Sequence, residues 1–311
     1  MAKNFLGLQI TMELLFVITT FFWAITFFLI KESILIIPPF VFLSIRFIIS
    51  SILIFPIFII QYKKNPIQNR HYFTKGVIVG FFLWAFFAFQ TIGLQYTSAT
   101  VAAFLTAFNI ILTPVIAAIL FKSSIEKRLR ISVLIAFIGV SFLSGVLEMD
   151  ISNIRGDLEL VGNSFIIFSV LAVVFHILTT EQFAPTIDPI ILLFLQLITA
   201  GIMSAVFMVI TGEFQLEYFS PLNWTTTIWI TLIVTIFFAT IFGYFVQTYY
   251  QSKKIISGSR VALILSIEPI FAAIIGMLFF SETLSLLGII GAVLIFTATI
   301  LSRPSDFNTN I

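Results

Sequence analysis

The sequence predicts an all-α integral membrane protein with ten transmembrane helices. Hydrophobic residues make up 60% of the 311 residues and charged residues only 10%, and the mean hydropathy is +1.15. Soluble domains carry roughly 25% charged residues, so a water-soluble fold could not bury this much apolar surface. The apolar segments are also long, close to the about 20 residues that cross the hydrocarbon core of a bilayer. Finally, they fall into two similar halves, which predicts a duplicated fold.

Ten apolar segments follow one another along the chain, separated by short polar connections. Pro39 and Pro189 open the second and seventh segments, where proline disrupts a helix least because first-turn N–H groups have no partner within the helix. The first segment is longer than the apolar core of a signal peptide and lacks a small-residue cleavage site, so we interpret it as a retained span. The expected spans are residues 11–30, 39–61, 76–94, 98–120, 130–147, 158–178, 189–211, 225–247, 257–280 and 284–302.

Basic residues predict the orientation, because cytoplasmic connections carry an excess of lysine and arginine. With the N-terminus inside, twelve basic residues fall on the inner side and two, Lys31 and Arg155, on the outer side. Both termini are therefore expected in the cytoplasm, in a multi-pass protein of the cell inner (plasma) membrane. The inner basic residues are Lys3, Lys63, Lys64, Arg70, Lys75, Lys122, Lys127, Arg128, Arg130, Lys253, Lys254 and Arg303.

Similar features recur in the two halves. A Gln-Thr pair near the end of the third and eighth spans precedes the serine that opens the next span. Another pair of polar residues follows the start of the second and seventh spans at the same distance. The matched positions are Gln90-Thr91 with Gln247-Thr248, Ser98 with Ser257, and Arg46 with Gln196.

Five spans in each half is an odd number, so the two copies run in opposite directions across the membrane. We predict a first five-helix repeat at residues 1–147 and a second at residues 158–303. An outer linker at residues 148–157 joins them, and residues 304–311 form a disordered tail.

Two polar residues occupy matched positions at mid-bilayer depth. Asn109 lies eleven residues after Ser98, and Glu268 lies eleven residues after Ser257. Each is close to a proline, and such groups usually face a cavity or another helix. The matched depth predicts a site near the interface between the repeats. Glu268 is the candidate for cation contact or proton coupling; the alternative is a protonated side chain bonded to the Leu265 carbonyl freed by Pro269.

Several features occur together in an order typical of one family. They are Trp23-Ala24 followed by Lys31; Arg46; Gln90-x-x-Gly93-Leu94-Gln95-Tyr96-Thr97-Ser98; Gly156-Asp157; and the stretch from Ser257 through Ala262 and Glu268-Pro269 to Ser281-Glu282-Thr283. This set, which extends over about residues 12–302, resembles the ten-span EamA-type branch of the drug/metabolite transporter superfamily. The first half departs from the pattern at Ser123 or a neighbour, where an acid like Glu282 is expected. The resemblance implies two inverted repeats around a central cavity and alternating access for small metabolites, without specifying the substrate.

Other polar and aromatic residues inside the spans are candidates for substrate binding. Arg46 lies seven residues into the second span, within reach of the headgroups, and could bind a solute carboxylate or phosphate. The alternative is a structural cation that holds helix carbonyls or an outer acid such as Glu32. His176 could relay protons, or it could be an ordinary interfacial residue. The remaining candidates, which could instead pack between helices, are Trp23, Trp84, Gln90, Tyr244 and Gln247.

Several functional classes are disfavoured by what the sequence lacks. There is no cysteine, so disulfides, thiolate catalysis and cysteine-based metal sites are excluded. We find no P-loop, no Gly-x-Ser-x-Gly motif and no metalloprotease motif, and two histidines do not supply a usual zinc site. We therefore expect no enzyme activity, no cofactor, no metal and no nucleic-acid partner. The expected partners are a small-molecule solute and membrane lipid, and the chain is expected to be a monomer or homodimer.

The sequence thus predicts a secondary transporter that moves a small organic metabolite by alternating access. Export of an amino acid or related solute, driven by a proton gradient or by the gradient of the solute itself, is the leading hypothesis. Import of a metabolite is nearly as compatible with the residues. A flippase for a lipid-linked substrate is a further alternative, and it predicts a lateral opening and little dependence on Glu268. An integral-membrane enzyme would need acids or histidines clustered at one membrane face, and the sequence has no such cluster.

Overall fold

The computed structural model describes residues 2–65, 70–122, 124–143, 156–280 and 285–302, and these residues are helical apart from short connections. Most of the predicted linker, the whole predicted tail, Ser123 and Glu282 lie outside the described residues. The first half contains α1 (Ala2–Ser33), α2 (Pro39–Lys64), α3 (Arg70–Tyr96), α4 (Ala99–Thr106), α5 (Asn109–Phe121) and α6 (Lys127–Leu143).

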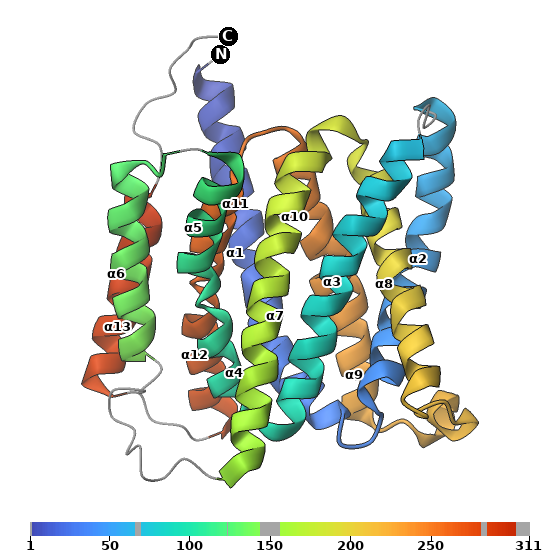
Figure 1. Cartoon of the computed structure of the whole chain (residues 1–311). Helices are drawn as coiled ribbons and strands as arrows, with labels where there is room; N and C mark the ends of the chain where they lie inside the picture. Colours follow the sequence, from blue (N-terminus) through green and yellow to red (C-terminus); the bar gives the residue numbers. More distant parts are fainter. Residues whose placement is uncertain (1, 66–69, 123, 144–155, 281–284, 303–311) are drawn as a thin grey trace.

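The second half contains a comparable series of helices (Figure 1). They are α7 (Gly156–Phe183), α8 (Pro189–Ile210), α9 (Thr226–Ile233), the π-helix η6 (Val234–Phe242), α10 (Gly243–Ser252), α11 (Gly258–Leu265), α12 (Glu268–Phe280) and α13 (Leu286–Leu301), with short 3₁₀ turns at Ala184–Thr186, Leu216–Phe219 and Pro221–Asn223.

Eight helical segments of the described chain are long and apolar enough to cross a membrane. They are Thr11–Ser33, Pro39–Lys64, His71–Tyr96, Ala99–Phe121, Leu158–Thr186, Pro189–Ile210, Thr226–Ser252 and Gly258–Phe279. A shorter apolar helix, Leu286–Leu301, follows them. The predicted spans at 130–147 and 284–302 correspond to α6 and α13, so the total of ten transmembrane helices stays a prediction.

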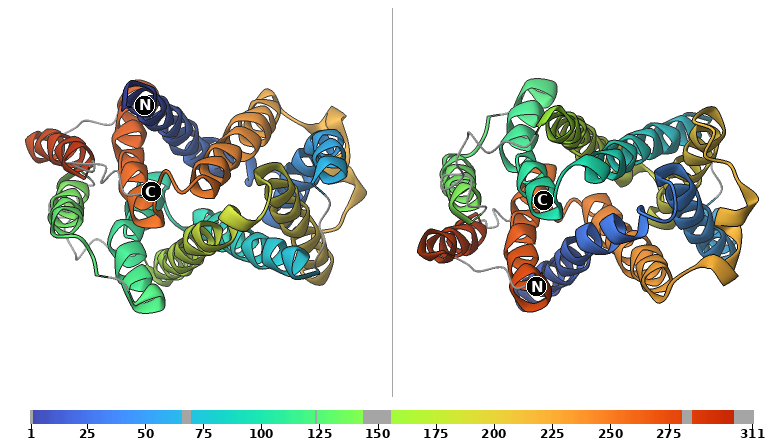
Figure 2. Two further views of the ribbon diagram at one scale, coloured as in Figure 1. Left: turned by 90° about the horizontal axis from the view of Figure 1, so that it is seen from above. Right: turned by 90° about the horizontal axis from the view of Figure 1, so that it is seen from below.

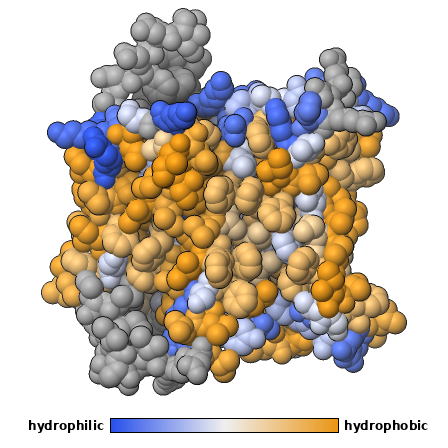
Figure 3. All heavy atoms as spheres, in the orientation of Figure 1, coloured by the Kyte–Doolittle hydropathy of each residue, from blue (hydrophilic) through white to orange (hydrophobic). Residues whose placement is uncertain are grey.

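The outer surface of the helix assembly matches a lipid environment. Figure 3 shows a broad hydrophobic band around the molecule between two hydrophilic rims. Large apolar side chains such as Ile119, Leu134 and Val293 are exposed on this band, at 60–70% of their surface. Exposure of this kind is favourable only where lipid replaces water. The chain is therefore a multi-pass membrane protein.

Helices of the two halves interleave. The most extensive packing joins α3 to α7, α6 to α13 and α2 to α8, so each pair takes one helix from each half. Figure 1 shows α6 with α13 at one end of the molecule and α2 with α8 at the other, and Figure 2 shows the same order along the helix axes. A side chain added at Gly93 would place its Cβ 2.9 Å from the carbonyl oxygen of Gly162, so glycine permits the close approach of α3 and α7.

Two transmembrane segments are broken at the same place. The α4–α5 and α11–α12 segments each consist of an 8-residue helix followed by a 13-residue helix. A serine begins each one, because the hydroxyl of Ser98 or Ser257 accepts a hydrogen bond from a first-turn N–H. At each break the backbone changes to i→i−3 hydrogen bonds, from Phe108 to Leu105 and from Ile267 to Ile264. Asn109 and Glu268, the first helical residues after the breaks, are buried, so both breaks lie inside the protein rather than against lipid.

Candidate functional site

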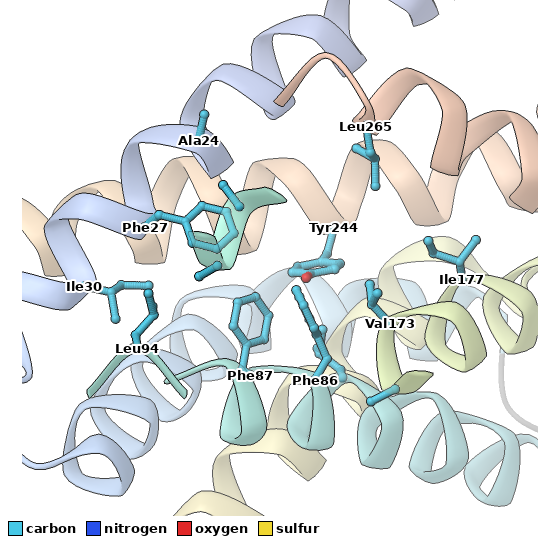
Figure 4. Packing of buried hydrophobic residues seen from close by; sticks show 14 of the residues in the cluster. Ala24, Phe27, Ile30, Phe86, Phe87, Leu94, Val173, Ile177, Tyr244 and Leu265 are labelled. Carbon is cyan, nitrogen blue, oxygen red and sulfur yellow. The ribbon is translucent and has the colours of Figure 1, made fainter. Parts of the chain in front are cut away.

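A cavity lies at the two helix breaks, in the middle of the bundle. It contains about 450 Å³ of space not occupied by atoms, and this volume includes open space at its mouth. Figure 4 shows Phe86 and Phe87 of α3 close to Phe27, Val173, Tyr244 and Leu265, which come from other helices. The lining residues are Trp23, Thr26, Phe27, Phe86, Phe87, Gln90, Thr106, Asn109, Val173, Tyr244, Gln247, Leu265 and Glu268.

Asn109 and Glu268 meet at this cavity, each as the first residue of the helix that follows a break. Asn109 is 3% exposed and Glu268 is 8% exposed, so water contacts neither side chain except through the cavity. The Oδ1 atom of Asn109 is buried and has no hydrogen-bond partner. The structure shows no hydrogen bond between the Glu268 carboxyl and the Leu265 carbonyl. Both side chains therefore have hydrogen-bonding capacity available to a ligand.

The start of a helix is also electrostatically distinctive. The dipole of the helix gives a partial positive charge at its start, which favours a nearby carboxylate. Glu268 lies at such a position at the start of α12, and Asn109 lies at the start of α5. The local structure thus stabilises an acid deep in the bilayer, a location at which an unsupported charge is costly.

Tyr244 is the aromatic centre of the cavity wall. Its ring is 5.4 Å from that of Trp23, 6.1 Å from that of Phe87 and 5.3 Å from that of His176, measured between ring centroids. Tyr244 therefore connects two cavity-lining aromatic residues with His176, which lies outside the lining.

The two matched glutamines, Gln90 and Gln247, both line the cavity. Gln247 donates to the Oε1 of Gln251 at 3.3 Å, and Gln251 in turn donates to the carbonyl oxygen of Ile177 at 3.1 Å. This chain of amides fixes the orientation of Gln247 and ties α10 to α7. Gln247 can still present polar atoms to a solute, as an amide carries both donors and acceptors.

Arg46 lies behind the cavity wall rather than in it. Its side chain is completely buried, Nε donates to the hydroxyl of Thr240 at 2.7 Å, and the guanidinium lies 4.1 Å from the ring centroid of Phe87. Neither Nη1 nor Nη2 has a hydrogen-bond partner. The expected reach to the headgroups, or to an outer acid such as Glu32, is not seen, because Phe87 and Thr240 hold the group inside the bundle.

His176 and Trp84 also lie outside the cavity lining. His176 is 1% exposed, so the interpretation as an interfacial histidine is wrong. Its Nε2 is 2.9 Å from the Oε1 of Gln196, whose Nε2 donates to the hydroxyl of Thr248 at 3.1 Å. Trp84 packs against Phe207, and its indole N–H is buried without a partner. Six of the predicted site residues thus come together at the cavity: Trp23, Gln90, Asn109, Tyr244, Gln247 and Glu268.

Sequence reasoning missed seven lining residues, and helical periodicity could have found most of them. Side chains three or four positions apart share one face of a helix. Thr26 and Phe27 follow Trp23 at this spacing, Phe86 and Phe87 precede Gln90, and Thr106 and Leu265 precede Asn109 and Glu268. Val173 precedes His176, another predicted site residue, at the same spacing, although His176 itself does not line the cavity. Within the described residues there is no group of three histidine, cysteine, aspartate or glutamate side chains that could hold a metal ion.

The fold and the cavity define the class of protein: a multi-pass membrane protein with a cavity between broken helices, lined mainly by apolar side chains and by a few polar ones, an arrangement typical of secondary transporters. The sequence pattern of the EamA-like transporter family matches twice, at residues 10–145 and 160–303. The chain therefore belongs to the EamA-like transporter family.

The individual proteins with similar sequences are also described as transporters. An uncharacterized transporter of Archaeoglobus fulgidus is 30% identical over 280 residues, covering 90% of this chain and 81% of the relative. The uncharacterized transporter YyaM of Bacillus subtilis is 26% identical over 255 residues, covering 80% and 78%. One solved crystal structure superimposes with a TM-score of 0.72 at 13% identity, covering 95% of this chain and 98% of the other. That likeness shows a shared fold.

Proposed function

We propose that this protein is a secondary transporter that carries a small organic metabolite across the cell inner (plasma) membrane by alternating access. The observation that carries the proposal is the meeting of Asn109 and Glu268 at one cavity, each at the start of a half-helix. Discontinuous helices of this kind provide binding sites near the midplane in many transporters. An amino acid or related solute, exported, fits a cavity with one acid and several amides.

The proposed roles follow from the positions of the groups. Glu268 contacts the cationic group of the solute, or binds the coupling proton, because it is the acid that lines the cavity. Asn109, Gln90 and Gln247 orient the solute through hydrogen bonds, and Trp23 and Tyr244 pack against its apolar part. We propose that His176, which does not line the cavity, supports the site indirectly by holding the Tyr244 ring through an edge-to-face contact.

We further propose that the two family matches correspond to inverted repeats with both termini in the cytoplasm. The matched breaks and the excess of basic residues on the side of the termini support this arrangement. The chain has no cysteine, so single cysteines replacing Lys64, Lys127 and Glu217 report sidedness. In intact cells, an impermeant thiol reagent should reach only the Glu217 position. Labelling at Lys64 or Lys127 instead would reverse the orientation.

The central experiment is a thermal-stability screen of the purified protein. The compounds are amino acids, polyamines, nucleotides, sugar phosphates and lipophilic cations. A ligand that binds only the folded state stabilises it by about 2.7 kcal/mol at a hundred times its dissociation constant. We expect a soluble compound to raise the melting temperature of the parent protein and of Glu217→Gln, a matched change of an exposed acid. In Glu268→Gln the shift should be lost.

The same screen separates the rival functions. A response confined to lipid-like molecules, unchanged in Glu268→Gln, would replace the carrier with a flippase for a lipid-linked substrate. Once a soluble ligand is known, its flux into or out of proteoliposomes under an imposed proton gradient distinguishes import from export. The elution volume of the protein then tests whether it is a monomer or a homodimer.

A further inference from the structure

The segment after α9 contains a nine-residue π-helix, η6, in the middle of a transmembrane helix. Its hydrogen bonds run from i to i−5, as from the Gly243 N–H to the carbonyl oxygen of Phe238. π-Helices are rare, usually single-turn, and frequently occur at functional sites. A change from the i−4 to the i−5 pattern admits an extra residue, so η6 sets the rotation of α10 relative to α9.

Two residues of the first half hold η6 at consecutive positions. The indole Nε1 of Trp23 donates to the carbonyl oxygen of Ala239 at 2.8 Å, and Nε of Arg46 donates to the hydroxyl of Thr240 at 2.7 Å. Trp23 comes from α1 and Arg46 from α2, so η6 is held by two separate helices. Gly243 lies in close contact with α1: an added Cβ would lie 3.1 Å from the Trp23 Nε1, so the neighbouring side chains would have to shift slightly.

Within the part of the chain that the structure describes, the bond to Thr240 is the sole hydrogen bond of the Arg46 guanidinium. Nη1 and Nη2 are buried and unpartnered, and the remaining support for the cation is the face of the Phe87 ring. A buried arginine that makes so few hydrogen bonds is costly, so the bond to Thr240 is central to what holds the group in place.

Thr240 shares a helix face with two lining residues of the cavity. Tyr244 and Gln247 follow it by four and seven positions, the spacing that places side chains along one face. A shift of the helix by one residue would turn this face by about 100°, because an α-helix has 3.6 residues per turn. Tyr244 and Gln247 would then leave the cavity, so the position of Thr240 determines whether they line it.

We propose that Arg46 and Thr240 are a positioning pair, which holds the register of η6 so that Tyr244 and Gln247 face the cavity. Arg46 acts through Thr240 and need not touch the solute. The significance of this pair rests on the proposed function, since it assumes that the cavity binds the transported solute. The register itself can be measured without transport, so the two proposals can fail separately.

The test uses thiol labelling in a chain that contains no cysteine. Single cysteines replace Gln247, which faces the cavity, or its neighbour Val246, which is 2% exposed and does not line it. Each purified protein is treated with methanethiosulfonate ethylammonium, a small water-soluble reagent, and the two labelling rates are compared. We expect the Gln247→Cys protein to react faster than the Val246→Cys protein.

The comparison of labelling rates is then repeated in two variants. Thr240→Val keeps the shape of the side chain but removes the hydroxyl acceptor, whereas Thr240→Ser keeps the hydroxyl acceptor. Loss of a hydrogen bond to a charged group changes an equilibrium by about tenfold or more. We expect Thr240→Val to lower the ratio of the two rates by about this factor, and Thr240→Ser to preserve it. A merely structural role would lower thermal stability without moving the ratio.

A double-mutant cycle with Arg46→Gln tests the pairing itself. If the two residues act together, Thr240→Val should have little further effect on the labelling ratio once Arg46 is replaced. Additive effects, or a ratio that Thr240→Val leaves unchanged while the protein elutes as a single folded species, would overturn the proposal. A binding measurement that fails while the labelling result holds would instead remove the proposed function alone.

Discussion

The two broken segments, α4–α5 and α11–α12, have the same backbone and different chemistry. Both begin at a serine cap, both break after eight residues, and both resume as a 13-residue helix. The first helical residue after the break is an amide, Asn109, in one and an acid, Glu268, in the other. The backbone of the site is thus duplicated, whereas the charge is present in one copy.

The same contrast extends to other matched positions. Lys31 lies two residues before the end of α1, and Glu181 lies two residues before the end of α7. Arg46 and Gln196 each lie seven residues after the proline that begins their helix. At these positions the first half carries cations and the second half carries an acid or an amide. The duplicated frame is therefore electrically asymmetric at these positions.

The largest expected effect comes from the packing that joins the halves. Gly93→Ala places a Cβ 2.7 Å from the Ile166 side chain and 2.9 Å from the Gly162 carbonyl oxygen. Alanine usually stabilises a helix, but overpacking of this kind costs about 1–3 kcal/mol. We expect a lower melting temperature, with Thr297→Ala on the exposed face of α13 as the control. A stabilised Gly93→Ala protein would show that α3 and α7 can separate freely.

A swap of the two site residues probes the asymmetry directly. Glu268→Asn should weaken binding of a stabilising solute by about 1.5–3 kcal/mol, the contribution of a hydrogen bond to a charged group. Adding Asn109→Glu returns one acid to the cavity from the opposite copy, and we expect part of the affinity to return. Calorimetric titration of the single and double variants measures both steps. No recovery at all in a folded double variant would mean that the two positions are not equivalent.

Lys31 and Glu181 make matched contacts of opposite polarity. The Lys31 Nζ donates to the carbonyl oxygens of Leu94 and Thr97, and the Glu181 carboxylate accepts from the Gly258 N–H at 2.9 Å. Each contact ties the end of one helix to the approach to a broken segment. Lys31→Met and Glu181→Met should each cost about 1–3 kcal/mol through an unsatisfied backbone group.

Chemical denaturation in detergent measures the two losses. If the contacts are equivalent, the two variants should lose similar stability, with Lys253→Met, at an exposed position, as the control. A loss of stability in only one of the two variants would mean that only one of the two contacts stabilises the fold.

The smallest expected effect concerns pH, at a contact that crosses between the halves. Glu213, in the connection after α8, accepts a hydrogen bond from the Phe40 N–H at the start of α2 at 2.8 Å. Burial raises the pKa of Glu213 above its usual value, although the backbone N–H groups of Phe40 and Val41 and the side chain of Thr211 act in the opposite direction. The folded protein therefore holds this proton more tightly than the unfolded chain does.

The sign of the pH dependence follows from this difference. The contribution of Glu213 to stability is complete below the ordinary pKa of the carboxyl group. It is lost as the pH rises through the higher value in the folded protein. The melting temperature of the parent protein, relative to Glu213→Gln, should fall slightly between about pH 4 and pH 8. A relative rise over this interval would contradict the raised pKa.

The sequence predicted the long apolar helices and the shared depth of Asn109 and Glu268, because hydropathy and register are local properties. It did not predict where the segments break. Pro114 lies five residues after Asn109, whereas the chain breaks before it, where the backbone bonds change partner. The π-helix η6 could not be predicted from the sequence either, since Val234–Phe242 contains neither proline nor glycine. The burial of Arg46 depends on Thr240 and Phe87, which are distant in sequence.

The interleaving of the halves has a consequence for biogenesis. During synthesis, α3 leaves the ribosome before α7 and α8, the helices against which its glycine face packs. Until the second half is inserted, α2, α3 and α6 lack their main packing partners and have only smaller contacts within the first half, such as α2 with α3 and α5 with α6. Assembly is therefore a late event, in which the arrival of the second half completes the first.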